Sequence, residues 1–253
     1  MPDAKHLQHL ITSGFIQVVV EGRSLPAYWA HPQVGGPFPG LVLLHDDQGM
    51  APYMRTLVHR FAQVGYYVAA PDLFDAQRPA SRFEAHALEQ QFMEAGQSKV
   101  HATLQAIRSH HKSNGKMALM GWDFGGTLVY DMAVQSGLPV MAAVSFYGNP
   151  QPYLGRFGTV EYPLLAVFGT QDEIARQHEE TLREELIRSG KPHEVIVYPD
   201  AAHGFYNDAS SAYNPEAADD AWRQALAFLE THQGKPPAPQ GARSGTFQHG
   251  RVY

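Results

Sequence analysis

The sequence of 253 residues contains no cysteine. Disulfides, thiolate metal sites and a thiol nucleophile are therefore excluded. The sequence also lacks an apolar run of the roughly 18 residues that a membrane-spanning helix needs. The stretch from Met1 to Gln8 lacks the basic and apolar regions of a signal peptide. We therefore expect a cytoplasmic protein that has no membrane partner.

Positive charge is also scarce, with 19 lysines and arginines against 25 aspartates and glutamates. The resulting formal charge of −6 argues against a nucleic-acid partner. The 14 histidines show no spacing typical of metal ligands, and we expect neither a metal nor a cofactor. The composition is 44% hydrophobic and 17% charged, as in an ordinary globular enzyme. We expect a small-molecule substrate and a monomer or homodimer.

Strand and helix signals alternate along residues 1–233, which we expect to form one domain. Continuous apolar runs such as 41–44 predict strands that are buried on both faces. A long helical region ends near residue 109, with a candidate break at Gly96. This alternation predicts an α/β fold with a mostly parallel sheet and helices on both faces. Reactive groups should then lie at the carboxyl ends of the strands.

The most informative stretch is Gly121-Trp122-Asp123-Phe124-Gly125-Gly126, which follows an apolar run. A strand that enters a Gly-x-nucleophile-x-Gly turn and continues as a helix is the nucleophile elbow of α/β-hydrolases. Asp172 and His203 each follow a later strand signal. The order of nucleophile, acid and histidine is that of α/β-hydrolases. The sequence therefore predicts that Asp123, Asp172 and His203 act together.

The chain resembles the dienelactone hydrolase family over nearly all of residues 12–231. The resemblance rests on the elbow and on Leu43-Leu44-His45-Asp46 with Gly49, Gly65-Tyr66 through Leu73, Ser145-Phe146-Tyr147-Gly148, Phe168-Gly169 to Asp172, and Tyr198-Pro199 to His203-Gly204-Phe205. It implies an α/β-hydrolase fold and metal-free hydrolysis of small lactones or esters by a Cys-His-Asp triad. By position, Asp123 replaces the nucleophile, His203 is the base and Asp172 orients it. The backbone N–H groups of Asp47 and Phe124 would form the oxyanion hole.

The sequence departs from this family pattern around the expected substrate pocket. Asp46 replaces a glutamate that contacts the thiol, and Asn207 replaces an arginine that binds the substrate carboxylate. The resemblance therefore does not extend to specificity for an anionic lactone at this position, and Arg78 and Arg82 are candidates to serve the same purpose. Trp122 is a further candidate for the pocket wall.

Two supporting roles follow from the same loop. If Asp46 lies beside Asp123, two carboxylates share one pocket and one of them should titrate at high pH. A protonated Asp46 would then be a candidate acid toward a leaving group. His45 is expected to support the oxyanion loop rather than to react.

Aspartate at the elbow leaves several mechanisms open. Its reference pKa of about 3.9 makes it a charged nucleophile near neutral pH. Attack on an ester carbonyl would give a high-energy mixed anhydride, whereas displacement at saturated carbon would give an ordinary alkyl ester, as in haloalkane dehalogenases and epoxide hydrolases. Alternatively, Asp123 or His203 acts as a general base for direct water attack. We rank the family activity first, the displacement route second, and an inactive ligand-binding homologue as the competing class.

Residues 234–253 form a Pro/Gly-rich tail that offers little to bury. We expect a mobile or loosely docked segment. The alternative is an arm that lies across a partner subunit, anchored by Phe247 and Tyr253.

Overall fold

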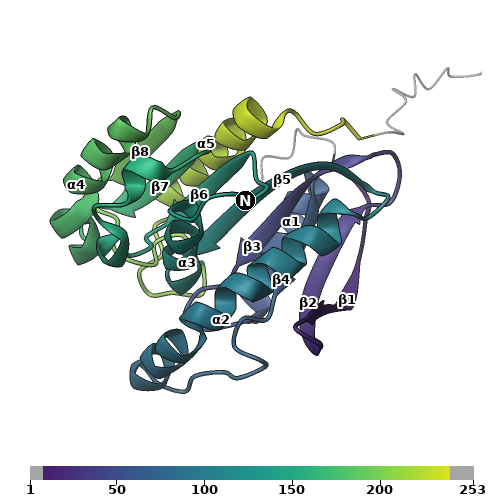
Figure 1. Cartoon of the computed structure of the whole chain (residues 1–253), viewed down its shortest axis with the longest axis horizontal. Helices are drawn as coiled ribbons and strands as arrows, with labels where there is room; N and C mark the ends of the chain where they lie inside the picture. Colours follow the sequence, from purple (N-terminus) through teal and green to yellow (C-terminus); the bar gives the residue numbers. More distant parts are fainter. Residues whose placement is uncertain (1–7, 240–253) are drawn as a thin grey trace, which may run out of the picture.

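The computed structural model describes residues 8–239. An eight-stranded sheet in the order β1-β2-β4-β3-β5-β6-β7-β8 forms its centre, with helices on both faces (Figure 1). β1 (Ile11–Val20) and β2 (Arg23–Pro32) form an antiparallel pair at one edge, and β2 is also antiparallel to β4. The other neighbouring strands are parallel. The predicted α/β-hydrolase fold is therefore confirmed.

The remaining elements alternate along the chain as expected. The strands are β3 (Phe38–Leu44), β4 (Tyr67–Pro71), β5 (Ser113–Trp122), β6 (Ala142–Phe146), β7 (Leu164–Gly169) and β8 (His193–Tyr198). The helices are α1 (Pro52–Gln63), α2 (Arg82–Arg108), α3 (Phe124–Ala133), α4 (Glu173–Ser189) and α5 (Pro215–Gln233), with short 3-10 turns η1 (Gln151–Tyr153) and η2 (Phe157–Thr159). β3, β4, β6 and β7 are buried along their whole length, which explains their continuous apolar sequences.

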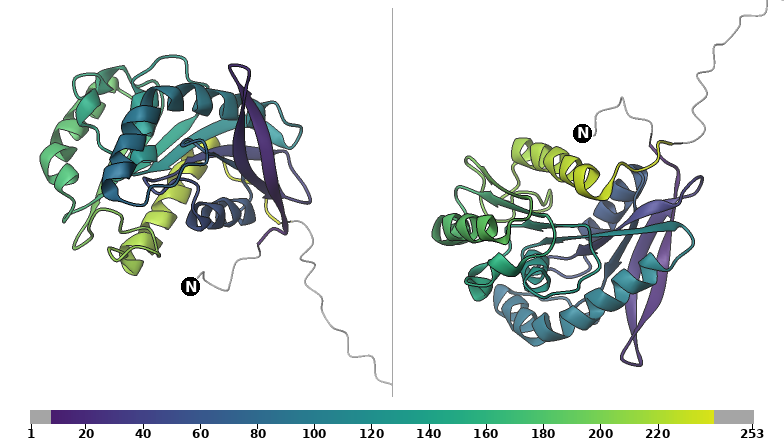
Figure 2. Two further views of the ribbon diagram at one scale, coloured as in Figure 1. Left: turned by 90° about the horizontal axis from the view of Figure 1, so that it is seen from below. Right: turned by 45° about the horizontal axis from the view of Figure 1, so that its top comes forward.

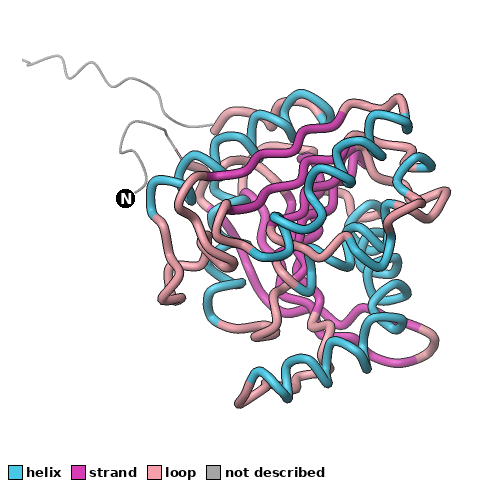
Figure 3. Tube along the Cα trace, turned by 90° about the vertical axis from the view of Figure 1, so that its left-hand side faces the viewer, coloured by secondary structure: helices cyan, strands magenta, loops and turns pink. Residues whose placement is uncertain are grey.

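Two hydrophobic cores lie on opposite faces of the sheet. α1 and α5 cover one face, and α2, α3 and α4 cover the other. Figure 2 and Figure 3 show helices on both sides of the sheet, and Figure 2 shows the β1–β2 pair, in dark purple, extending beyond them at one edge. Within residues 8–239, no helix is both long and apolar enough to cross a membrane.

The break expected at Gly96 is wrong, because α2 is one continuous helix from Arg82 to Arg108. Gly96 is buried against α3, and a Cβ atom added there would lie 2.8 Å from Cδ2 of Leu128. The glycine therefore allows two helices to approach closely rather than ending one of them.

The first residues of the tail lie against the domain. Nε2 of His9 is 3.0 Å from the carbonyl oxygen of Pro237. A Cβ atom added at Gly65 would lie 2.8 Å from Cβ of Pro236, so the chain passes directly over this turn. The anchors expected for a partner-binding arm, Phe247 and Tyr253, lie outside the described residues.

The elbow depends on a close approach between α3 and β3. A Cβ atom added at Gly125 would overlap the carbonyl of Leu44 and lie 2.6 Å from the carbonyl oxygen of His45. We therefore expect Gly125→Ala to lower the free energy of unfolding by about 2–3 kcal/mol, measured by urea denaturation. Gly158→Ala is the control, because its new Cβ atom would meet only Cβ of Arg188 at 3.8 Å. Equal effects of the two substitutions would show that the close approach is unimportant.

Candidate active site

Asp123 occupies a strained turn between β5 and α3. Its backbone has φ 50° and ψ −111°, a conformation uncommon for residues other than glycine. Two backbone hydrogen bonds fix the turn. The N–H of Asp123 donates to the carbonyl of Phe146 at 3.0 Å, and the N–H of Gly125 donates to the carbonyl of His45 at 3.0 Å. Strain of this kind is typical of functional sites. It holds the Asp123 side chain at the carboxyl end of β5, where it is 27% exposed.

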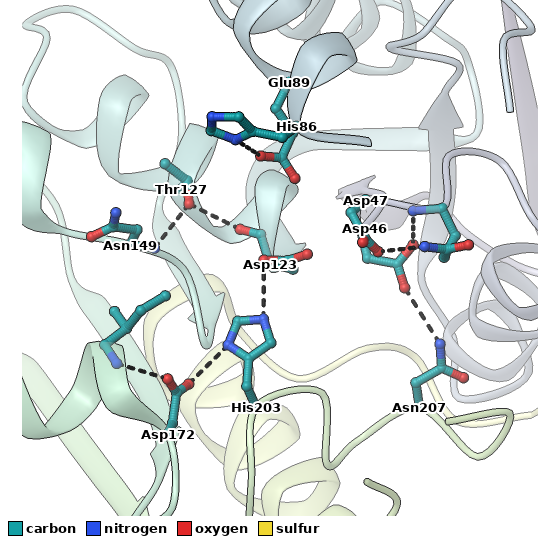
Figure 4. Close-up of polar contacts among 12 residues, drawn as sticks. Asp46, Asp47, His86, Glu89, Asp123, Thr127, Asn149, Asp172, His203 and Asn207 are labelled. Carbon is teal, nitrogen blue, oxygen red and sulfur yellow. Dashed lines mark hydrogen bonds and ion pairs between the residues drawn. The ribbon is translucent and has the colours of Figure 1, made fainter. Parts of the chain in front are cut away.

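The structure brings the three predicted side chains together (Figure 4). Nε2 of His203 is 3.1 Å from Oδ1 of Asp123, and Nδ1 of His203 is 3.0 Å from Oδ2 of Asp172. Asp172 is almost completely buried. Its other carboxylate oxygen accepts a hydrogen bond from the N–H of Ile174 at 2.9 Å and so caps α4. One carboxylate therefore starts a helix and orients the imidazole.

His203 lies between two carboxylates, and this determines its charge. Burial of His203 would lower its pKa, but the hydrogen bonds and charges of Asp123 and Asp172 outweigh burial and raise the pKa to about 10. Both ring nitrogens then carry protons and donate, one to each carboxylate. An imidazolium cannot accept a proton, so at neutral pH His203 is unsuited to the base role that the resemblance implies.

We expect NMR titration of the His203 ring to show an imidazolium until the pH approaches about 10. Because folding raises this pKa from 6.5, the ion pairs contribute stability that is complete below about pH 6.5 and is lost as the pH rises through about 10. Asp123→Asn should lower the pKa of His203, because one of the two negative partners is removed. A wild-type ring that is neutral at pH 7.5 would contradict this assignment.

Asp46 is a buried carboxyl group on the loop after β3. It accepts hydrogen bonds from the N–H of Gln48 at 3.0 Å and from Nδ2 of Asn207 at 3.4 Å. Burial raises the pKa of Asp46 to about 7, and the charges of Asp47 and Asp123 add to this rise. The expectation that one carboxyl group of the pocket titrates at high pH is therefore met by Asp46. Burial contributes more than the charge of Asp123.

His45 supports this loop, as the sequence predicted. Nδ1 of His45 donates to the carbonyl of Asp46 at 2.8 Å, and Nε2 accepts from the N–H of Leu73 at 3.0 Å. One nitrogen must therefore donate while the other accepts, which requires the neutral ring. Burial lowers the pKa of His45 to about 4 and keeps the ring neutral.

Of two residues expected in the substrate pocket, one lies in the core and the other joins neighbouring loops. Trp122 is fully buried in the core under α1 and α5, stacked 5.3 Å from Phe146, because its side chain leaves the end of β5 on that face. Arg78 donates to the carbonyl of Met50 at 3.1 Å and forms an ion pair with Asp72 at 3.5 Å. Its guanidinium therefore joins the loop after β3 to the segment that follows β4.

Arg82, the first residue of α2, is the other arginine expected near the substrate. Burial raises the pKa of Asp47, while the charges of His203 and Arg82 partly offset this rise. Arg82 therefore lies within electrostatic range of Asp47. Asn207, expected at the position of the family arginine, contacts Asp46 instead.

Glu89 on α2 is a site residue that the sequence analysis missed. Its carboxylate forms a 3.5 Å contact with Nδ1 of His86 and is 26% exposed. Burial, together with the charges of Asp123 and Asp47, raises the pKa of Glu89 to about 7. Figure 4 shows it on the α2 side of Asp123. No motif marks this residue, because only the packing of α2 across the sheet brings it near the elbow.

Thr127 supports the elbow from one helical turn further along α3. Its hydroxyl donates to the carbonyl of Asp123 at 3.1 Å and accepts from the N–H of Asn149 at 2.8 Å. The i+4 spacing of Thr127 after Asp123 could have indicated this contact. Among residues 8–239, no group of three or more histidine, aspartate and glutamate side chains is arranged to hold a metal ion.

Comparison with known proteins shows the family to which this chain belongs. The sequence profile of the dienelactone hydrolase family matches residues 25–233. The chain belongs to this family. It is 31% identical over 238 residues to a carboxymethylenebutenolidase of Pseudomonas putida. The aligned region covers 87% of this chain and 100% of that protein. This dienelactone hydrolase family member is therefore a hydrolase.

Solved structures show the same fold at lower identity. The dienelactone hydrolase from Anabaena variabilis has a TM-score of 0.68 and 18% identity, covering 89% of this chain and 100% of that one. A dienelactone hydrolase-like promiscuous phosphotriesterase from metagenomic libraries has a TM-score of 0.79 and 19% identity. The match covers 88% of this chain and 98% of that one. Both comparisons support the α/β-hydrolase fold alone.

Proposed function

We propose that this dienelactone hydrolase family member hydrolyses a small ester or lactone, using Asp123, His203 and Asp172. The observation that carries the proposal is the unbroken chain of hydrogen bonds from Asp172 through His203 to Asp123. These side chains follow β7, β8 and β5, and so meet at one edge of the sheet. The name of the Pseudomonas putida relative supports the ester and lactone class.

Asp123 is the general base in this proposal. Its carboxylate takes a proton from a water molecule while the water oxygen attacks the ester carbonyl carbon. This route avoids the mixed anhydride that direct attack by Asp123 would form. His203 stays protonated, fixes one Asp123 oxygen by its 3.1 Å hydrogen bond and offsets the negative charge of the site.

The developing oxyanion needs donors, and the family positions supply the backbone N–H groups of Asp47 and Phe124. Phe124 is the first residue of α3, where N–H groups have no acceptor within the helix. When the tetrahedral intermediate collapses, the carbon–oxygen bond to the leaving group breaks and that oxygen takes the proton of neutral Asp46. Exchange with solvent returns the water proton from Asp123 and reprotonates Asp46.

The acid role of Asp46 predicts a pH dependence. We expect kcat/KM for an ester to fall as the pH rises through about 7, because the neutral acid is lost at its raised pKa. Asp46→Asn should remove this ionisation and lower the low-pH activity at least tenfold. Glu89→Gln is the necessary control, since the pKa of Glu89 is also about 7, and it should retain the ionisation. Loss of the ionisation in the Glu89 variant alone would reject Asp46 as the acid.

Turnover of matched substrate panels tests the proposed function. We expect hydrolysis of small uncharged esters and lactones, followed by acid release. Haloacids and epoxides test the displacement route, which the family comparisons do not favour. Tight binding of an ester or lactone without turnover would instead assign the chain to non-catalytic ligand binding.

A further inference from the structure

Carboxyl groups surround the reacting side chain of Asp123 on several sides. Asp46 and Asp47 lie on the loop after β3, and Glu89 approaches from α2 (Figure 4). The charges of Asp47 and Asp123 both act on Glu89 across this space. Above about pH 7, where Asp46 and Glu89 ionise, the site therefore concentrates negative charge around the place where a substrate must bind.

Few positive groups oppose this charge. His203 is already paired with two carboxylates, and Arg82 acts on Asp47. Arg78 is engaged by Asp72 and by the carbonyl of Met50. A substrate carboxylate would therefore meet a field of its own sign.

The position that binds the substrate carboxylate in the family carries no positive charge here. Asn207 replaces the guanidinium expected there and has no charge. Its amide nitrogen points to Oδ2 of Asp46 at 3.4 Å, so its donor is directed to a protein carboxyl group. An anion that entered here would need to displace this contact.

We propose that the site selects small esters or lactones carrying an ammonium group over anionic ones, with Glu89 as a specificity-determining residue. This inference rests on the proposed hydrolase function. Glu89 acts at a distance by attracting the cationic part of the substrate, and it takes no part in bond making or breaking.

Three acetate esters test the charge preference. Acetylcholine and 3,3-dimethylbutyl acetate have the same shape and differ in charge, and 4-acetoxybutanoate carries a carboxylate. At pH 8.5 and low salt, we expect kcat/KM for the cationic ester to exceed that for the neutral ester by about tenfold. We expect kcat/KM for the anionic ester to be about tenfold below that for the neutral ester. High salt should shrink both ratios.

Substitutions on α2 locate the effect. Glu89→Gln should reduce the cation-to-neutral ratio about threefold, and Glu89→Asp should restore most of it. Glu94→Gln is the matched control, because Glu94 is exposed on the same helix and should leave the ratio unchanged. A structural role for Glu89 would change turnover of all three esters equally and would overturn its assignment.

The outcomes separate this inference from the proposed function. Turnover of the neutral ester with a cation-to-neutral ratio of one or below would overturn the charge preference and leave the hydrolase function standing. If no ester is turned over, the proposed function fails. Binding of choline against 3,3-dimethylbutan-1-ol, followed by NMR shifts, then still decides the charge preference, and equal affinities would reject it.

Discussion

Asp123→Asn is expected to lower kcat/KM for an uncharged ester by about 1,000-fold, within the range for loss of a general base. Asparagine has nearly the same shape and tolerates the positive φ of the elbow, so the fold should be retained. Its amide oxygen can still accept from Nε2 of His203, but the amide cannot take a proton from water. The measurement is the initial rate on 3,3-dimethylbutyl acetate over a range of substrate concentrations.

The effect should belong to the elbow carboxylate and not to the change of one charge on the molecule. Asp219→Asn, on the exposed side of α5, removes the same charge and should keep full activity. Activity in Asp123→Asn within tenfold of wild type would show that another group activates the water.

Substitutions of Asp172 should have the second largest effect on activity. Asp172→Asn and Asp172→Ala both remove the charge that orients His203, and we expect each to reduce kcat/KM by about 100-fold. The two variants should differ in stability. Asparagine caps a helix about as well as aspartate, whereas alanine loses the hydrogen bond from the N–H of Ile174 and about 1 kcal/mol.

This pair separates the two roles of one side chain. Rates measured with 3,3-dimethylbutyl acetate report the orientation of His203, and urea denaturation reports the cap of α4. If Asp172→Asn retained full activity, the charge of Asp172 would be unnecessary and the neutral cap alone would account for this residue.

Much of the fold and site could be predicted because local signals agreed with tertiary structure. The apolar run 41–44 became β3, buried on both faces, and the glycines around Asp123 became the close approach of α3 to the sheet. Asp172 and His203 could be placed because each follows a strand that is parallel to β5 in the same sheet. The carboxyl ends of parallel strands lie at one edge of the sheet, so the order of strands along the chain was enough to predict that these residues lie together.

Other features depend on contacts that sequence spacing does not encode. Glu89 reaches the site only because α2 crosses the sheet near the elbow, and Trp122 turns into the core because of the face on which β5 ends. The protonation of His203 depends on two carboxylates at 3.0 and 3.1 Å, on opposite sides of one ring. That balance between burial and two charges could not be derived from residue types alone.

Single turnover in oxygen-18 water, with enzyme in excess over an uncharged ester, tests the central claim most directly. After quenching, the released acid and the peptide that carries Asp123 are analysed by mass spectrometry. Direct attack by water predicts one label in the acid and none in the peptide. Label in the Asp123 carboxylate would show that this side chain bonds to the substrate, and would contradict its role as a base.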